Sequence, residues 1–409
     1  MNAFLSELRG GWRNLLAATI GLGFGIPCYT PVSSLFFRAV GMQFGWSKAV
    51  AAGALIALPI AALAFPFAGR LIDRFGVRAI SGFSVMAAVL AFLWLARLSG
   101  GVGEYYAAII ALNVLGCGTG PMCYTVLVAA QFREARGAAL ACAQFGIAFV
   151  AVLFPPIIGL TMSSYGWRGG YLLLAATTLA GGILAQVLMR PVQPMAAQPC
   201  SGEGITARAA ASSTAFWLLG LAILAISIAS IGLVSAFQSV LIERGIAEHT
   251  ATWFISLLAL SVMLSRLAVG RVLDLKHPAR SSAIIMGLAA VGSGLLLTPP
   301  ATPVTGLATV LVGFSIGAEL DLMAYFCARL FGLRHYAAIY GLLAMFFYVG
   351  MALGGFGYGL MRDRLGSYEP ALLTTTVLLA LGGCLFLRLD RRAWMSPPEL
   401  EQGVSHVAS

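Results

Sequence analysis

Long runs of apolar residues separated by short polar segments dominate the pattern of this chain. A helix needs about 20 mostly apolar residues to cross a bilayer, and many of the runs reach that length. They do not alternate apolar and polar residues at period two, as the strands of a membrane β-barrel do. The pattern predicts twelve transmembrane helices, at 14–37, 47–68, 79–98, 104–130, 137–162, 170–189, 214–242, 251–270, 281–299, 303–328, 337–361 and 370–388.

A long polar interruption at residues 191–213 divides these segments into two groups of six. Its Pro, Ser, Ala and Gly content is typical of an exposed linker. The same landmarks recur on both sides, because Asp73 and Asp274 lie 201 residues apart and Gly166 and Gly366 lie 200 apart. Such a constant offset indicates a duplicated unit. We therefore predict a six-helix bundle at 1–190, a cytoplasmic linker at 191–213, a second six-helix bundle at 214–392 and a cytoplasmic tail at 393–409.

Composition supports an integral membrane protein. Hydrophobic residues make up 60% of the chain and charged residues 10%, with a mean hydropathy of +0.91, whereas soluble domains carry about 25% charge. The net charge of +10 is unevenly distributed. When the segments are threaded alternately, most arginines fall on the side that also holds both termini. Positive charge is retained in the cytoplasm, so we expect cytoplasmic termini, a multi-pass protein of the cell inner membrane and no nucleic-acid partner.

Several functional classes find no support in the motifs. The seven cysteines form no CxxC pair and no metal-type spacing, and the four histidines form no cluster. The sequence contains no Walker-type phosphate loop, and no nucleophile–base arrangement is recognisable. We therefore predict that the protein is not an enzyme, uses no metal or other cofactor, and is not driven directly by ATP hydrolysis. We expect a monomer.

Three ionisable side chains lie deep inside apolar segments: Arg266, Glu319 and Asp321. Burying such a group in hydrocarbon costs at least about 2.5–3.5 kcal/mol, so these residues usually have a function. A guanidinium group matches a carboxylate as a rigid fork and does not lose its proton. This chemistry favours Arg266 as an anion-binding residue. The alternative is that Arg266 extends toward the nearby cytoplasmic surface.

The two acids are separated by roughly 200° around a helix, so they cannot share one face. We expect at most one of them to point into a central cavity and the other to contact a neighbouring helix. Burial favours the neutral form of a carboxyl group, so Glu319 and Asp321 are both candidates for proton coupling. Glu319 is placed first because it lies nearer the middle of its segment. The alternative for either acid is a structural role.

The loop after the second segment reads G-x-L-x-D-R-x-G-x-R, beginning at Gly69, and a degenerate copy begins at Gly270. This pattern resembles the signature loop of the major facilitator superfamily. The resemblance implies a transporter of two six-helix bundles and a latch that stabilises its outward-facing state. The latch residues would be Gly69, Asp73, Arg74, Gly76, Arg78, Gly270 and Asp274. The alternative is a loop that only anchors positive charge.

Other stretches resemble the monocarboxylate and oxalate–formate transporter branch of that superfamily. They are QFGWSKA from Gln43, RGAAL from Arg136, FPP from Phe154 and GWRGGY from Gly166. In that branch an arginine of the eighth segment contacts a substrate carboxylate, and the resemblance implies this role for Arg266. The chain departs from the branch in two places: the first segment has no acidic residue and the eleventh has no lysine.

Polar side chains on the segments expected to line the cavity are further candidates. Hydroxyl and amide groups orient ligands, although most of them in membrane helices bond to their own backbone or to a neighbour. Beside Arg266, the candidates for substrate contact are Tyr29, Asn113, Tyr124, Gln144, Gln238 and Tyr348.

These features predict a secondary active transporter that works by alternating access. Its cargo would be a small organic anion, by resemblance a monocarboxylate, with a proton or an exchanged anion as the coupled species. One alternative is an exporter or importer of a neutral or amphipathic metabolite or drug on the same fold. A membrane sensor on this scaffold is the other, and it is disfavoured because we find no cytoplasmic signalling domain in the sequence.

Overall fold

Helices form the regular structure of the described part of the chain. The computed structural model describes residues 2–46, 50, 57–190, 204–274 and 277–393. Within those ranges the elements are α-helices and short 3₁₀ helices, with one isolated bridge between Gly204 and Gly332. The predicted all-helical class is confirmed.

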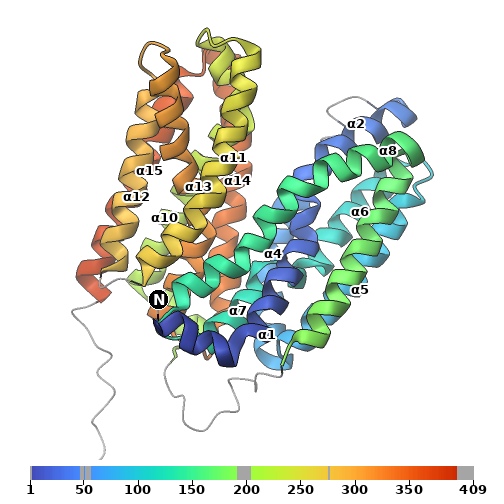
Figure 1. The fold of residues 1–409 in the computed structure, drawn as a ribbon, viewed down its shortest axis with the longest axis vertical. Helices are drawn as coiled ribbons and strands as arrows, with labels where there is room; N and C mark the ends of the chain where they lie inside the picture. Colours follow the sequence, from blue (N-terminus) through green and yellow to red (C-terminus); the bar gives the residue numbers. More distant parts are fainter. Residues whose placement is uncertain (1, 47–49, 51–56, 191–203, 275–276, 394–409) are drawn as a thin grey trace, which may run out of the picture.

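The first half of the chain forms the bundle drawn from blue to green in Figure 1. Its elements are α1 (Asn2–Phe24), η1 (Ile26–Cys28), η2 (Thr30–Val32), α2 (Ser33–Phe44), α4 (Ala57–Phe75), α5 (Val77–Ala96), α6 (Val102–Leu115), η4 (Cys117–Thr119), α7 (Pro121–Gln131) and α8 (Arg136–Leu188).

Two predicted segments of this half are broken rather than straight. The segment 14–37 bends by 45° between α1 and α2, where Pro27 and Pro31 lie in the connecting 3₁₀ turns. The segment 104–130 is interrupted by η4 between α6 and α7, beside Gly116 and Pro121. Proline lacks the N–H that a continuous helix needs, and glycine relaxes the backbone, so both breaks have a local cause.

The fifth and sixth predicted segments lie within one long element, α8. Its 53 residues contain a single non-helical position, Gly166, with φ of 68° and ψ of −179°. A residue with a Cβ rarely adopts a positive φ, so glycine is needed where the chain turns back. In Figure 1 the ribbon of α8 climbs along the bundle and then returns beside α5.

The second half repeats this arrangement in the yellow-to-red bundle of Figure 1. Its elements are α9 (Ala207–Ser212), α10 (Thr214–Glu243), α11 (Glu248–Leu273), α12 (Pro278–Leu295), α13 (Thr302–Phe331), α14 (Tyr336–Leu365) and α15 (Glu369–Ala393). The short helix α9 lies within the range 191–213 predicted as a linker. It begins after Thr206, whose side chain accepts a hydrogen bond from the Ala209 N–H.

Seven of the described helices are long and apolar enough to cross a membrane, or eight if the bent pair α1–α2 is one span. This count supports a multi-pass protein and is lower than the twelve segments predicted. Two segments are merged in α8, one is divided between α6 and α7, and α12, the predicted segment 281–299, is not among the helices counted. The segment 47–68 lies partly outside the described residues.

The two bundles meet near the end that carries the N-terminus, and their ribbons diverge toward the other end (Figure 1). At the meeting point α4 packs on α14, and α8 packs on α11. A Cβ on Gly69 would collide with the Ala337 carbonyl oxygen, and a Cβ on Gly137 with the Gly270 carbonyl oxygen. Small residues let membrane helices approach this closely, so glycine allows both contacts between the halves.

Candidate functional site

A buried polar triangle joins the two halves where α8, α11 and α13 meet. The Arg266 Nη1 lies 3.8 Å from Oδ1 of Asp321 and donates to Oε1 of Gln144 over 3.4 Å. The Gln144 Nε2 donates to the same Asp321 oxygen over 2.5 Å. Arg266 is 7% exposed, and Gln144 and Asp321 are fully buried. The predicted anion-binding arginine therefore lies in the interior rather than at the surface.

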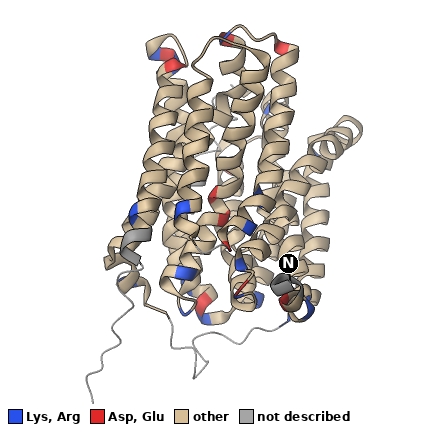
Figure 2. Ribbon diagram, turned by 60° about the vertical axis from the view of Figure 1, so that its left-hand side comes forward, with Lys and Arg blue, Asp and Glu red and all other residues tan. Residues whose placement is uncertain are grey.

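Charged residues are rare in the interior of the bundles. In Figure 2 most of the blue and red segments lie toward the ends of the helices, and only a few lie between them. A buried ion pair gains little net stability after desolvation, but removal of one partner costs about 3–5 kcal/mol because the other charge is left unpaired. The Arg266–Asp321 pair therefore leaves each residue dependent on the other as its charged partner.

The second buried acid, Glu319, has a different environment. Its Oε1 accepts a hydrogen bond from the Ser227 hydroxyl of α10, a helix of the same half, and the side chain is 3% exposed. Asp321 instead contacts Gln144 of the first half. The two acids thus point to different neighbours, as their helical spacing predicts.

Two atoms of the polar triangle have no hydrogen-bond partner among the described residues: Nε of Arg266 and Oδ2 of Asp321. A buried polar atom without a partner costs about 1–3 kcal/mol, and few such atoms persist in native proteins. The triangle therefore offers one further donor and one further acceptor to a small molecule.

The remaining substrate-contact candidates do not join the triangle in the described structure. Tyr29 packs in the core of the first bundle, with its ring centroid 5.9 Å from that of Phe92. Asn113 donates to the Ile109 carbonyl of its own helix. Tyr124 is fully buried.

Two candidates of the second half make no hydrogen bond to Arg266 in the described structure. Gln238 is half-buried on α10. Tyr348 of α14 stacks on Phe65 of α4, with centroids 4.7 Å apart, so it contributes to the contact between the halves. Of the six candidates, Gln144 is the one that the described structure brings to Arg266.

Asp73 and Asp274 make equivalent contacts between the halves. The Asp73 carboxylate accepts hydrogen bonds from the N–H groups of Ala337 and Ala338, over 3.1 and 3.0 Å, at the start of α14. Asp274 accepts from the N–H groups of Gly137 and Ala138, over 2.7 and 3.0 Å, at the start of α8. Each acid thus caps a helix of the opposite half, where the helix dipole favours negative charge.

Burial at this contact raises the pKa of Asp73 from 3.8 to about 6, partly offset by the two backbone hydrogen bonds. Desolvation likewise raises the pKa of Asp274. Two further motif residues follow Asp73: the Arg74 guanidinium lies over the Phe75 ring, and Gly76 has a φ of 84° at the start of α5. Arg78 is exposed in the first turn of that helix.

The helix starts that Asp73 and Asp274 cap were not predicted from the sequence. The stretches RGAAL and YAAIYG have small residues directly after a charged loop, which is typical of a helix start. Their sequence does not indicate which acid caps each helix. Ser227 was also missed, because a serine in an apolar segment usually bonds to its own helix.

The turn before α8, whose start Asp274 caps, is held by a carboxylate of its own half. The Glu7 carboxylate of α1 accepts hydrogen bonds from the N–H groups of Arg133, Glu134 and Ala135. It therefore holds the turn that precedes α8 within its own half.

Known proteins resemble this chain over most of its length. Monocarboxylate transporter 2 of Rattus norvegicus is 22% identical over 92% of this chain and 82% of its own length. Monocarboxylate transporter 11 of Homo sapiens is 26% identical over 93% and 84%. Among solved structures, FucP, the fucose:proton symporter of E. coli, in its outward conformation matches with a TM-score of 0.71 at 15% identity, covering 92% of this chain and 98% of that one.

The family model described as "Major Facilitator Superfamily" matches residues 14–355. That match covers most of the chain, which forms two helical bundles that exchange aspartate caps. The chain is therefore an integral membrane transporter of the major facilitator superfamily, not an enzyme.

Proposed function

We propose that this transporter moves a small organic anion, of the monocarboxylate class, together with a proton. The observation that carries the proposal is the buried triangle of Arg266, Asp321 and Gln144, which joins the two halves. Secondary transporters bind their substrates at the interface between their repeats. A cation at that interface is the group that a carboxylate substrate needs.

The chemistry of Arg266 favours a planar anion. Its Nη1 is engaged by Asp321 and Gln144, while its Nε lacks a partner among the described residues. A guanidinium group binds carboxylates through parallel N–H groups, so a substrate carboxylate would satisfy this donor. The names of the relatives from Rattus norvegicus and Homo sapiens support the same class.

Proton coupling follows from the balance of charge in the triangle. When Asp321 is ionised, it neutralises Arg266, and a second carboxylate would leave a net negative charge in a buried site. Protonation of Asp321 would release Arg266 for the substrate, so the loaded site would again be neutral. Buried unpaired charge is costly, so the halves would rearrange only in a neutral state. Asp321 is therefore the first candidate for proton coupling and Glu319 the second, the reverse of the order expected from position along the segment.

The caps made by Asp73 and Asp274 would act as the latch. They join α4 to α14 and α11 to α8, and the two bundles meet near the end that carries the N-terminus (Figure 1). With cytoplasmic termini, this arrangement is the outward-facing state, closed toward the cytoplasm. Opening that end would require both carboxylates to leave the helix starts that they cap.

The proposed function is tested by uptake into proteoliposomes. We expect labelled lactate or a comparable monocarboxylate to accumulate when a pH gradient is imposed, and to equilibrate without accumulation when the gradient is collapsed. A neutral sugar of similar size serves as the control. Accumulation of the sugar rather than the monocarboxylate would contradict the anion assignment and favour a neutral metabolite.

We expect Asp73→Ala to open the end of the molecule that carries the N-terminus. Loss of a helix cap costs about 0.5–2 kcal/mol, which shifts the population toward the open state. Cys142 is half-buried on α8. In a protein whose other cysteines are replaced, we expect Asp73→Ala to raise the alkylation rate of Cys142. Asp274→Ala should have the same effect, and both together a larger one.

Asp363→Ala, which removes an exposed acid on α14, is the matched control and should leave the alkylation rate of Cys142 unchanged. Equal rates in the Asp73 variant and the unmodified protein would show that these caps do not hold the end closed.

A further inference from the structure

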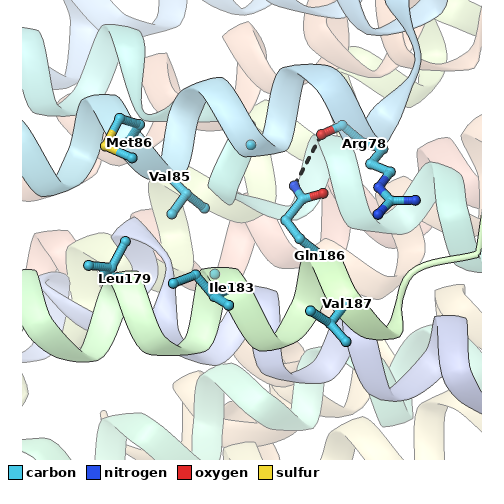
Figure 3. A pocket seen from close by; sticks show the side chains of 9 residues that line it. Arg78, Val85, Met86, Leu179, Ile183, Gln186 and Val187 are labelled. Carbon is cyan, nitrogen blue, oxygen red and sulfur yellow. Dashed lines mark hydrogen bonds between the residues drawn. The ribbon is translucent and has the colours of Figure 1, made fainter.

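A shallow apolar cavity of about 210 Å³ lies between α5 and the second part of α8, on the outside of the first bundle. Figure 3 shows Val85 and Met86 of α5 facing Leu179 and Ile183 of α8. Met86 and Ile183 are 51% and 55% exposed, so the cavity opens to the surface that a bilayer surrounds. Apolar side chains line most of it, and its lining includes no acid from the described part of the chain.

Two glycines shape this groove. A Cβ on Gly82 would meet only the amide of Gln186, at 3.2 Å, whereas a Cβ on Gly182 would collide with Val85. Gly182 therefore lets the helices approach each other, and Gly82 leaves the space open above their contact. From Arg78 to Met86 the groove follows eight residues of helix, about 12 Å at the rise of an α-helix.

Positive charge lies at one end of the groove. Arg78 borders it in the first turn of α5, and among the described residues no acid forms an ion pair with its guanidinium group. Gln186 donates to the Arg78 carbonyl oxygen over 3.1 Å and so closes this end (Figure 3). The start of α5 has no side-chain cap, and its dipole adds to the attraction for an anion.

From this combination we infer that the groove between α5 and α8 is a binding site for an anionic glycerophospholipid. One acyl chain lies along Val85, Met86, Leu179 and Ile183, and the phosphate group contacts Arg78. Basic residues at the cytoplasmic ends of membrane helices attract anionic headgroups in this way. A free phosphate ion would use only the charged end and would leave the apolar groove empty.

Two substitutions would fill the groove. Gly82 and Gln186 are a small and a polar residue of its lining. The double variant Gly82→Ile/Gln186→Phe places large apolar side chains at both positions.

Native mass spectrometry of the full-length protein in detergent, titrated with dioleoyl phosphatidylglycerol or dioleoyl phosphatidylcholine, tests the site. We expect tighter binding of phosphatidylglycerol. Arg78→Gln should weaken it about fivefold, the equivalent of about 1 kcal/mol for one basic residue near a headgroup. Arg78→Lys should retain the preference, and Gly82→Ile/Gln186→Phe should reduce binding by at least the same factor.

Arg388→Gln is the matched control, because it removes an exposed cation near the end of α15 in the other bundle. It should bind phosphatidylglycerol as the unmodified protein does. Melting temperatures measured without added lipid identify any variant that fails to fold. The proposal is wrong if both lipids bind equally well, or if the folded Arg78→Gln and Gly82→Ile/Gln186→Phe variants retain full binding of phosphatidylglycerol.

Discussion

Arg266→Ala is expected to abolish monocarboxylate uptake and to remove the stabilisation of the protein by carboxylates. Truncation of one member of a buried, hydrogen-bonded charge pair costs about 2–5 kcal/mol or more in binding. At about 1.4 kcal/mol per tenfold, this corresponds to a loss of roughly 30-fold or more in affinity. A thermal-shift panel of carboxylates, followed by uptake assays, measures both effects.

The single variant also leaves Asp321 buried without its cation, which destabilises the fold independently of any substrate. The double variant Arg266→Ala/Asp321→Ala removes both charges and separates the two effects. We expect it to recover thermal stability relative to Arg266→Ala, while carboxylates still fail to stabilise it. Arg266→Lys keeps the charge but loses the planar fork, so we expect weaker binding rather than none.

The matched control for this series is Arg271→Ala, because Arg271 lies five residues further along α11, about 1.4 helical turns, and is exposed. It should bind carboxylates like the unmodified protein. If Arg266→Ala and the double variant were both stabilised by carboxylates as strongly as the unmodified protein, Arg266 would not belong to the binding site.

The second large effect is expected from Asp321→Asn. The amide is similar in size to the carboxyl group but does not take up a proton in the physiological range. It also leaves Arg266 permanently available to the substrate. We therefore expect a variant that still exchanges labelled for unlabelled substrate but no longer accumulates it in response to a pH gradient. Counterflow and gradient-driven uptake, measured in the same proteoliposomes, distinguish the two activities.

Glu319→Gln is the comparison on the same helix. The Glu319 carboxyl accepts its hydrogen bond from Ser227 within its own half, so its charge is not linked to Gln144 across the interface. We expect gradient-driven accumulation to persist in this variant. Accumulation that survives Asp321→Asn but disappears in Glu319→Gln would exchange the proposed roles. If neither substitution affected accumulation, proton coupling through α13 would be excluded.

The architecture was largely predictable because its signals are local or periodic. Apolar runs predict membrane helices from composition alone, and the repeated glycine–aspartate loops locate the duplication. The breaks in the helices were less predictable. Pro27 and Gly116 lie in segments whose mean hydropathy is high, so a reading based on length treats each segment as continuous. At Gly166 the structure instead joins two predicted segments, because the turn at this single residue is short enough for both to lie within α8.

The site was only partly predictable. Arg266, Glu319 and Asp321 stand out because charge is rare in apolar segments, and helical spacing separates the two acids. Spacing says nothing of which neighbour each acid meets. Gln144 lies on another bundle, 177 residues from Asp321, and Ser227 resembles any other serine of a membrane helix. The hydroxyl groups of Tyr29 and Tyr124 suggest substrate contact, but both side chains are buried in the protein core.

The paired caps of Asp73 and Asp274 bear on the origin of the chain. In each pair, an acid of one half contacts the helix start of the other, and the same relation holds when the halves are exchanged. That is the geometry of an isologous interface between two identical subunits. A homodimer of a six-helix ancestor would contain both contacts from a single aspartate codon. Fusion of two such copies would free each contact to change alone, so that the two loops could diverge while both carboxylates remained.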